Sequence, residues 1–252
     1  LFLSAHKFPG GPAASGILVV KNELSATSRP SWPGGGTVTY VSPWNHDYVS
    51  LLSAREEAGT PNVIGDIRAA LCFLVKDAIG ADWLRARQAE LKERVFTAWE
   101  KSPNIRILGN KNAERLPIFS FQIRGADGEL VHHQLFTRML SDRYGIQARG
   151  GCACAGPYGH DLLEIDADQS AEMREEIRKG NPLARPGWIR LNLSYLLSDE
   201  KANFIIESVS ELANSADKFV DDYVFDHTTG SFLHKQIAVA SEELSVGGAC
   251  CS

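Results

Sequence analysis

The first third of the chain changes from short apolar runs, bounded by glycine and proline, to long helical patterns. Within the first 45 residues, the apolar runs at 16–20 and 37–41 predict strands. Apolar residues then recur at helical spacing from Asn62 onward, and again from Ala81 to about residue 101. These positions are Ile64, Ile67, Leu71, Leu74 and Ala78 in the first helix and Leu84, Leu91, Val95 and Ala98 in the second. Two consecutive amphipathic helices indicate a transition between domains near residue 80.

The remainder of the chain alternates between strand and helix patterns. Strands are predicted at 105–108, 117–123 and 188–195, with a short strand leading into residue 149. Helices are predicted at 129–144 with Gly145 beyond its end, at 161–180, and after the capping residue Ser198. After about residue 223 the pattern fades. We therefore expect an α/β or α+β protein with parts at 1–80 and 81–225 and an irregular tail at 226–252.

Composition and charge exclude several classes of protein. The 252 residues are 44% hydrophobic, which is enough for a substantial core and rules out a disordered or fibrous chain. A net charge of −5 and a pI near 5.8 argue against nucleic-acid binding. No apolar run approaches the ~20 residues that span a bilayer, so no membrane association is expected. Five sparse cysteines are typical of free thiols in a reducing compartment, and the cytoplasm is the expected location. Because the chain opens on Leu1 as if within a strand, we expect it to lack the N-terminal part of a longer protein.

Two glycine-rich regions near the N-terminus contain candidate chemistry. Lys7, in the run Ser4-Ala5-His6-Lys7 before Gly10 and Gly11, is placed to act as a nucleophile or to form a Schiff base. Taken alone, an exposed loop lysine is the simpler interpretation. The turns at 34–37 and 57–62 offer backbone N–H groups and threonine hydroxyls to one phosphate, although, taken alone, an ordinary helix-capping turn is the simpler interpretation.

Thiols and arginines provide a second set of candidates. Arg149 precedes Cys152 and Cys154 in a glycine-flanked loop, where nearby positive charge favours a reactive thiolate. A zinc site or a strained disulfide is an alternative, but His132, His133 and His160 show no spacing that completes a zinc site. Cys72 lies within a predicted helix and is interpreted as an inert hydrophobic residue. Arg190, in an otherwise apolar strand, suits either a substrate carboxylate or an internal ion pair.

In combination these motifs resemble the class V aminotransferase family of fold type I pyridoxal-phosphate enzymes. The resemblance is strongest to its cysteine desulfurase and selenocysteine lyase branch. The matching stretches include SAHKFPGGPAASGILVVK, PGGGTV, REEAGTPNVIGDIRAAL, GIQARGGCACAGP and GWIRLNLSYLLSDEKANFIIESVSEL, and they span most of residues 1–212. The resemblance implies an α/β fold: the C-terminal remnant of a large PLP-binding (PLP-transferase, fold type I) domain followed by a small α+β domain.

The resemblance also assigns roles to individual residues. Lys7 corresponds to the lysine that forms the Schiff base with pyridoxal 5′-phosphate, and Ser4 and His6 to its neighbours on the phosphate side. Gly59 and Thr60 correspond to a turn that reaches the cofactor of a partner subunit, which implies a homodimer with shared sites.

In the second part of the chain, Cys154 corresponds to the thiol that receives sulfur, Arg149 to the arginine before that loop, and Arg190 to the arginine that binds the substrate carboxylate. The implied function is cysteine desulfuration on a small amino-acid substrate, with a sulfur-acceptor protein as a further partner. An aminotransferase, a lyase or a truncated non-catalytic relative is the alternative. Cys152 has no assigned role, and the acidic segment 158–186 is longer than the link in compact desulfurases.

Overall fold

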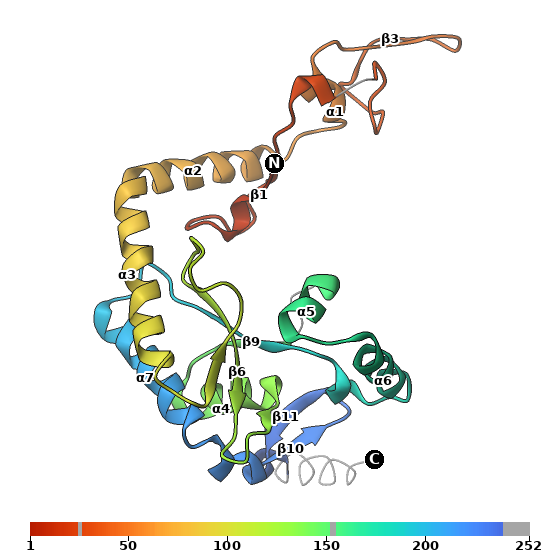
Figure 1. Cartoon of the computed structure of the whole chain (residues 1–252). Coiled ribbons are helices and arrows are strands. Elements are labelled where there is room, and N and C mark those ends of the chain that lie inside the picture. The colour runs from red at the N-terminus through yellow and green to blue at the C-terminus, as the bar shows by residue number, and fades with distance from the viewer. Residues whose placement is uncertain (25–26, 152–154, 239–252) are drawn as a thin grey trace, which may run out of the picture. The chain divides into compact units, whose positions relative to one another are not determined.

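The computed structural model describes residues 1–24, 27–151 and 155–238. The chain divides into two compact units, unit 1 (Leu1–Leu84) and unit 2 (Arg85–Ser252). The order of their elements can be followed in Figure 1. None of the helices in these described ranges combines the length and apolar character that crossing a bilayer requires.

Unit 1 contains two short hairpins and a long helix. Strand β1 (Phe2–Ser4) pairs antiparallel with β2 (Gly16–Leu18), and β3 (Val38–Val41) pairs antiparallel with β4 (His46–Tyr48). The helical elements are the 3-10 turns η1 (Ala5–Lys7) and η2 (Asn22–Leu24), the short helix α1 (Leu52–Glu56) and the long helix α2 (Val63–Ile79). The strand predictions at 16–20 and 37–41 and the helix prediction from residue 62 are confirmed.

Helix α2 has clear boundaries and an exposed apolar face. The Asn62 side chain accepts a hydrogen bond from the Gly65 N–H at 3.1 Å, and Gly80 ends the helix with φ +87°. The residues that the helix buries are Gly65, Ala69 and Cys72. The apolar positions identified by their spacing face outward instead: Ile64, Ile67, Leu71 and Leu74 are each more than half exposed. Unit 1 thus leaves an apolar stripe on α2 uncovered.

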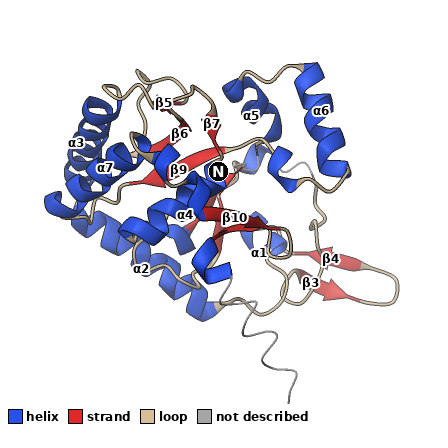
Figure 2. Cartoon of the chain, turned by 90° about the horizontal axis from the view of Figure 1, so that it is seen from below, coloured by secondary structure: helices blue, strands red, loops and turns tan. Residues whose placement is uncertain are grey.

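Unit 2 is built on a five-stranded antiparallel sheet. The strands are β5 (Ile105–Ile107), β6 (Ile118–Arg124), β7 (Leu130–Val131), β8 (Arg149–Gly151) and β9 (Trp188–Asn192), in the order β5-β6-β9-β8 with β7 beside β6. The helices are α3 (Ala81–Trp99), which begins at the end of unit 1, α4 (His133–Tyr144), α5 (Gly156–Leu163), α6 (Ala167–Arg178) and α7 (Asp199–Ala213). Figures 1 and 2 show α3 and α7 on one side of the sheet and α5 and α6 on the other.

Strict alternation gives the sheet one buried face and one polar face. Along β6, Phe119, Phe121 and Ile123 are fully buried, whereas the residues between them are partly exposed. The buried face packs against apolar side chains of α3, α4 and α7, including Leu91, Val95, Phe136, Met139, Ile206 and Leu212. Trp99 joins α3 to α7, because its indole N–H donates to the Ile206 carbonyl at 3.1 Å. We call the opposite side, with Ser120, Gln122, Arg149 and Arg190, the polar face.

Three sequence predictions for unit 2 are wrong in detail. The predicted helix 129–144 begins with β7, which pairs with β6, so α4 starts only at His133. The predicted helix 161–180 is two helices, because Glu164 adopts φ +59° and Asp166 forms a new capping box with Gln169. The tail predicted from residue 226 instead continues as a hairpin of β10 (Tyr223–Asp226) and β11 (Ser231–His234), stabilised by the contact of Phe225 with Phe232. The short 3-10 turns of this unit are η3 (Pro182–Ala184), η4 (Ala216–Lys218) and η5 (Val220–Asp222).

Candidate active site

Lys7 ends the turn η1 that joins the two strands of the first hairpin. The chain continues through further tight turns, with the Phe8 N–H donating to the Ala5 carbonyl at 3.0 Å and the Gly11 N–H to the Phe8 carbonyl at 2.9 Å. A Cβ at Gly11 would overlap the Ala5 carbonyl oxygen, so the turn requires glycine there. Ala5 is buried, whereas His6 and Lys7 are exposed. Within the described ranges the Lys7 amine has no hydrogen bond or ion pair, and it is therefore available to a ligand.

The loop after Lys7 is held against α2. The Ser15 N–H donates to the Gly65 carbonyl at 3.1 Å, and the Phe8 and Phe73 rings meet edge to face at 5.5 Å. The Ser15 hydroxyl is buried and finds no hydrogen-bond partner among the described residues. These contacts hold the turn that carries Lys7 in a fixed position relative to α2.

The two glycine-threonine turns at 34–37 and 57–62 are far apart in the sequence but lie side by side in the structure. The Gly59 N–H donates to the Gly35 carbonyl at 2.9 Å, and Gly59 has φ +88°, a conformation that favours glycine. Thr37 is fully buried and donates its hydroxyl to the Gly34 carbonyl at 2.7 Å, whereas Thr60 is exposed. Thr37 therefore has a structural role. In the described ranges no hydrogen bond or ion pair joins Gly59 or Thr60 to Lys7.

The two candidate arginines of unit 2 lie directly opposite each other on neighbouring strands. Arg149 of β8 is in register with Arg190 of β9, which is in register with Ser120 of β6, so all three side chains project from the polar face. Like charges in directly opposed positions destabilise a sheet. Neither guanidinium has an acidic partner among the described residues. The internal ion pair considered for Arg190 is therefore absent from this part of the chain.

Arg190 lines a cavity of about 460 Å³ on the polar face. Its walls come from the β5–β6 connection, from β9 and from α5, and they include Asn110, Arg115, Tyr158 and Trp188. No aspartate or glutamate is among the residues that line it. A cavity that Arg190 lines and that no carboxylate lines suits a small anion such as the carboxylate of an amino acid.

The predicted thiol loop, Cys152 and Cys154, lies outside the described residues. Its flanks are described: β8 ends at Gly151, and α5 begins at Gly156 after Ala155. Among the described residues no cluster of three potential metal ligands occurs. Cys72 is a free thiol, 1% exposed within α2, as interpreted from the sequence.

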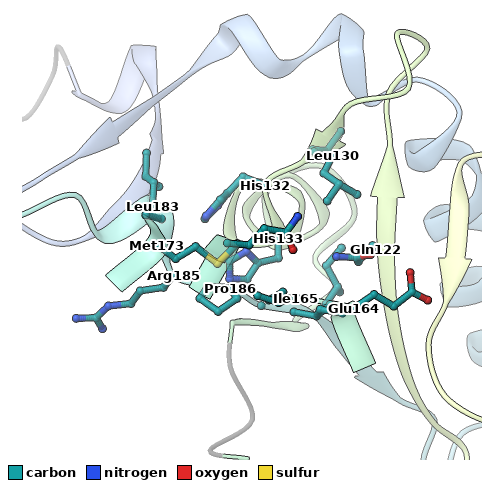
Figure 3. A pocket seen from close by; sticks show the side chains of 16 residues that line it. Gln122, Leu130, His132, His133, Glu164, Ile165, Met173, Leu183, Arg185 and Pro186 are labelled. Atoms are coloured by element: carbon teal, nitrogen blue, oxygen red, sulfur yellow. The ribbon is translucent and has the colours of Figure 1, made fainter. Parts of the chain in front are cut away.

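Sequence reasoning considered His132 and His133 only as zinc ligands and missed their position at the base of a second cavity. This cavity, about 450 Å³, is lined by apolar side chains such as Leu130, Met173 and Leu183 (Figure 3). Burial lowers the pKa of His133 to about 4, with a smaller contribution from His132. Burial also lowers the pKa of His132; the Leu183 backbone faces its ring and offsets part of this shift. Neither ring nitrogen of His132 reaches a hydrogen-bond partner in the described ranges. Both histidines are therefore neutral at pH 7. Two adjacent histidines before an apolar helical run were the available signal.

Residues 1–171 match the family model described as Aminotransferase class-V. The chain therefore belongs to the class-V aminotransferase family. Members of this family depend on pyridoxal phosphate, and the family branch indicated by curated relatives is that of cysteine desulfurases. Over 155 residues the chain is 33% identical to a cysteine desulfurase of Cronobacter sakazakii and 32% identical to a probable cysteine desulfurase of Vibrio cholerae. Each match covers 61% of this chain and 36% of the relative, so the chain matches only about a third of these proteins' length.

Solved structures of the family share this fold. The apo cysteine desulfurase of Thermococcus onnurineus NA1 superposes with a TM-score of 0.66 at 24% identity, over 84% of this chain and 46% of that protein. The cysteine desulfurase CsdA of Escherichia coli superposes with a TM-score of 0.59 at 22% identity, over 78% of this chain and 41% of that one. At these identities the superpositions establish the fold, which is that of fold type I enzymes in the part that the chain covers.

Proposed function

We propose that this chain forms part of a pyridoxal-phosphate-dependent cysteine desulfurase. The observation that carries the proposal is Arg190: its guanidinium lines a cavity without carboxylates and has no acidic partner in the described ranges. Together with the cysteine desulfurase relatives, this supports binding of an amino-acid carboxylate. In domain terms, residues 1–80 are proposed as the end of a large cofactor-binding domain and residues 81–225 as the small domain.

The residues present fit the cofactor by the chemistry of their donor groups. Lys7 presents an unpartnered primary amine that can condense with an aldehyde, and Ser4 and His6 offer donors to a phosphate from the same turn. Gly59 and Thr60 are proposed to donate to a cofactor phosphate from an exposed turn. When bound, pyridoxal phosphate supplies an electron sink for the carbon next to the substrate carboxylate.

The other steps are assigned to residues of this chain. Arg190 would hold the substrate carboxylate with two parallel hydrogen bonds, and Arg149 would add a second positive charge on the same face. Lys7, with its amine free, would take up the proton of the substrate α-carbon and later return it. Cys154, as a thiolate, would bond to the substrate sulfur as the carbon–sulfur bond breaks, leaving a persulfide on Cys154 and alanine as the second product.

The first test is cofactor binding by the longest available gene product. Pyridoxal phosphate is added to wild type and to Lys7→Ala, with the exposed Lys21→Ala as the matched control. We expect the visible absorbance of a Schiff base in wild type and in Lys21→Ala, and its loss in Lys7→Ala. An equal spectrum in all three would contradict the role of Lys7, and a featureless spectrum in wild type would favour a non-catalytic relative.

The second test separates desulfuration from the other activities of the family. In the longest available gene product, sulfide and alanine are measured from cysteine with wild type and Cys154→Ser, without added thiol. Loss of both products in Cys154→Ser supports the desulfurase. Sulfide release that survives the substitution would instead favour an aminotransferase or lyase that needs Lys7 and Arg190 but no enzyme thiol.

We further propose that the protein is a homodimer, delivers sulfur to an acceptor protein, and works in the cytoplasm. The exposed apolar stripe of α2 supports dimerisation, because contiguous apolar surface usually marks an interface. The expected result is a dimer by light scattering that becomes monomeric when Ile67 and Leu71 are both replaced by Glu. A wild-type monomer would contradict the dimer. The buried free thiol of Cys72 is consistent with a reducing compartment.

A further inference from the structure

The cavity beside His133 is a second candidate binding site in unit 2. Its volume of about 450 Å³ lies within the usual range for ligand pockets, roughly 300–1,000 Å³. Its walls come from α4, α5, α6 and η3, together with parts of β6, β7 and β9 (Figure 3). It shares no lining residue with the cavity that Arg190 lines. A ligand bound here would therefore not occupy the proposed carboxylate site.

Most of the wall is apolar. The apolar side chains are those of Leu130, Val131, Leu163, Ile165, Met173, Leu183, Pro186 and Ile189. At the base, the His133 ring packs against the His132 ring, with centroids 4.2 Å apart, and the His132 ring in turn lies 5.4 Å from that of Phe232. The Met173 thioether adds a group that makes favourable contacts with aromatic rings. This wall suits an apolar ring.

Two charged residues belong to the wall, and neither turns its charge into the cavity. The Glu164 carboxylate pairs with Arg106 at 2.8 Å, and Arg185 is exposed. Figure 3 shows the Glu164 carboxylate and the Arg185 guanidinium pointing away from the His133 ring. An ion that entered the cavity would lose hydration without gaining an opposite charge, which costs free energy. The cavity therefore favours a neutral ligand.

Two neutral polar side chains remain to bind such a ligand. His133 and Gln122 line the cavity, and neither side chain has a hydrogen-bond partner in the described ranges. Both are partly exposed, and their polar atoms are not among the unpartnered atoms that are sealed from the surface, as the ring nitrogens of His132 are. The Gln169 side chain is occupied, since it accepts the Asp166 N–H at 3.1 Å. A neutral imidazole offers one donor and one acceptor, so it can bind a hydroxyl or an N–H group.

We propose that this cavity binds a small neutral molecule with an apolar ring and one hydroxyl or N–H group, as in a phenol or an indole. The ring would lie against the apolar wall that includes Met173 and Leu183, and the polar group would be bound by His133 or Gln122. The inference goes beyond the proposed function, because none of the residues assigned to cofactor, substrate or sulfur lines this cavity.

The test compares 4-methylphenol with toluene, which lacks the hydroxyl, and with benzoate, which carries a charge. Binding to the longest available gene product is titrated by NMR of the methionine methyl groups. Met173 lines the cavity, whereas Met139 is fully buried in the core and serves as the internal control. Each signal is assigned by its absence in Met173→Leu or Met139→Leu.

We expect 4-methylphenol to shift the Met173 signal and to leave the Met139 signal in place. It should bind about three- to tenfold more tightly than toluene, the gain from one hydrogen bond. Benzoate should leave both signals unchanged. The proposal is overturned if none of the three compounds shifts the Met173 signal, or if benzoate binds to wild type and this binding is lost in Arg185→Gln.

Variants identify the polar contact. His133→Phe keeps a ring at the base of the cavity, and Gln122→Leu keeps a side chain of similar size. At least one of them should reduce the ratio of the 4-methylphenol and toluene constants to about one while toluene still binds, and Arg185→Gln, the matched control, should leave the ratio unchanged. A preference for 4-methylphenol that survives both substitutions would overturn the proposal.

A further measurement keeps the test decisive if His133→Phe does not fold. In Gln122→Leu, the His133 ring signals must then respond to 4-methylphenol and not to toluene, and an equal response to both would likewise overturn the proposal. None of these outcomes bears on the Lys7 and Cys154 tests, so the proposed function stands or fails separately.

Discussion

The neutral His133 makes unit 2 sensitive to mild acid. Its ring is wedged against glycine backbone, since a Cβ on Gly187 would overlap Nε2, and burial lowers its pKa from 6.5 to about 4. As the pH falls, His133 therefore binds a proton near pH 6.5 in the unfolded chain but only near pH 4 in the folded chain. The stabilisation from neutral His133 is complete above pH 6.5 and is lost as the pH falls through this window.

The size of the effect follows from the two pKa values. A shift from 6.5 to about 4 corresponds to roughly 3.4 kcal/mol in total, of which about 2 kcal/mol is lost between pH 7 and pH 5. In His133→Asn no ring can titrate at this position. Between pH 7 and pH 5 the free energy of unfolding of this variant should therefore fall by about 2 kcal/mol less than that of wild type. Urea unfolding followed by circular dichroism at both pH values measures this difference.

The matched control is His227→Asn, which removes an exposed histidine from the β10–β11 hairpin of the same unit. It should keep the wild-type loss of stability between pH 7 and pH 5. Equal losses in wild type and His133→Asn would refute the reasoning, as would a His133 ring that titrates near pH 6.5 by NMR.

Two further predictions concern the packing and capping of unit 2. Phe121→Ala should lower the free energy of unfolding by about 3–5 kcal/mol, because Phe121 is fully buried and its ring centroid lies 4.8 Å from that of Trp99. The control is Ile118→Ala, at a 40% exposed position of the same strand. Equal losses of stability in the two variants would show that the buried face does not dominate stability. Asp166→Ala should lower the free energy of unfolding by about 1 kcal/mol and fray the start of α6, because it removes the acceptor of the Gln169 N–H hydrogen bond at 2.8 Å. Asp168→Ala removes an acidic residue of the same turn that does not cap the helix, and it should lower the free energy of unfolding less. Amide hydrogen exchange across α6 measures both effects.

Periodicity was sufficient to predict most helices and strands, because α3, β6 and α7 each bury one face and carry strong local boundaries. Asn62, Gly145 and Ser198 cap their helices where the sequence predicted. The strand predictions failed where pairing with the preceding strand of a hairpin decides the local structure. β7 exists only because β6 pairs with it, and β11 only because β10 does.

The sequence by itself determined the family, the order of the candidate residues and the alternation that puts Arg190 on the polar face of its strand. Lys7, Thr60 and Arg190 could be selected from their motifs alone, because each motif is local. Only the tertiary structure decided that Arg149 and Arg190 oppose each other, that Arg190 lines a cavity without carboxylates, and that His133 is buried and neutral. Charge balance, burial and pKa depend on neighbours from distant segments, and the linear spacing of residues does not encode which segments meet.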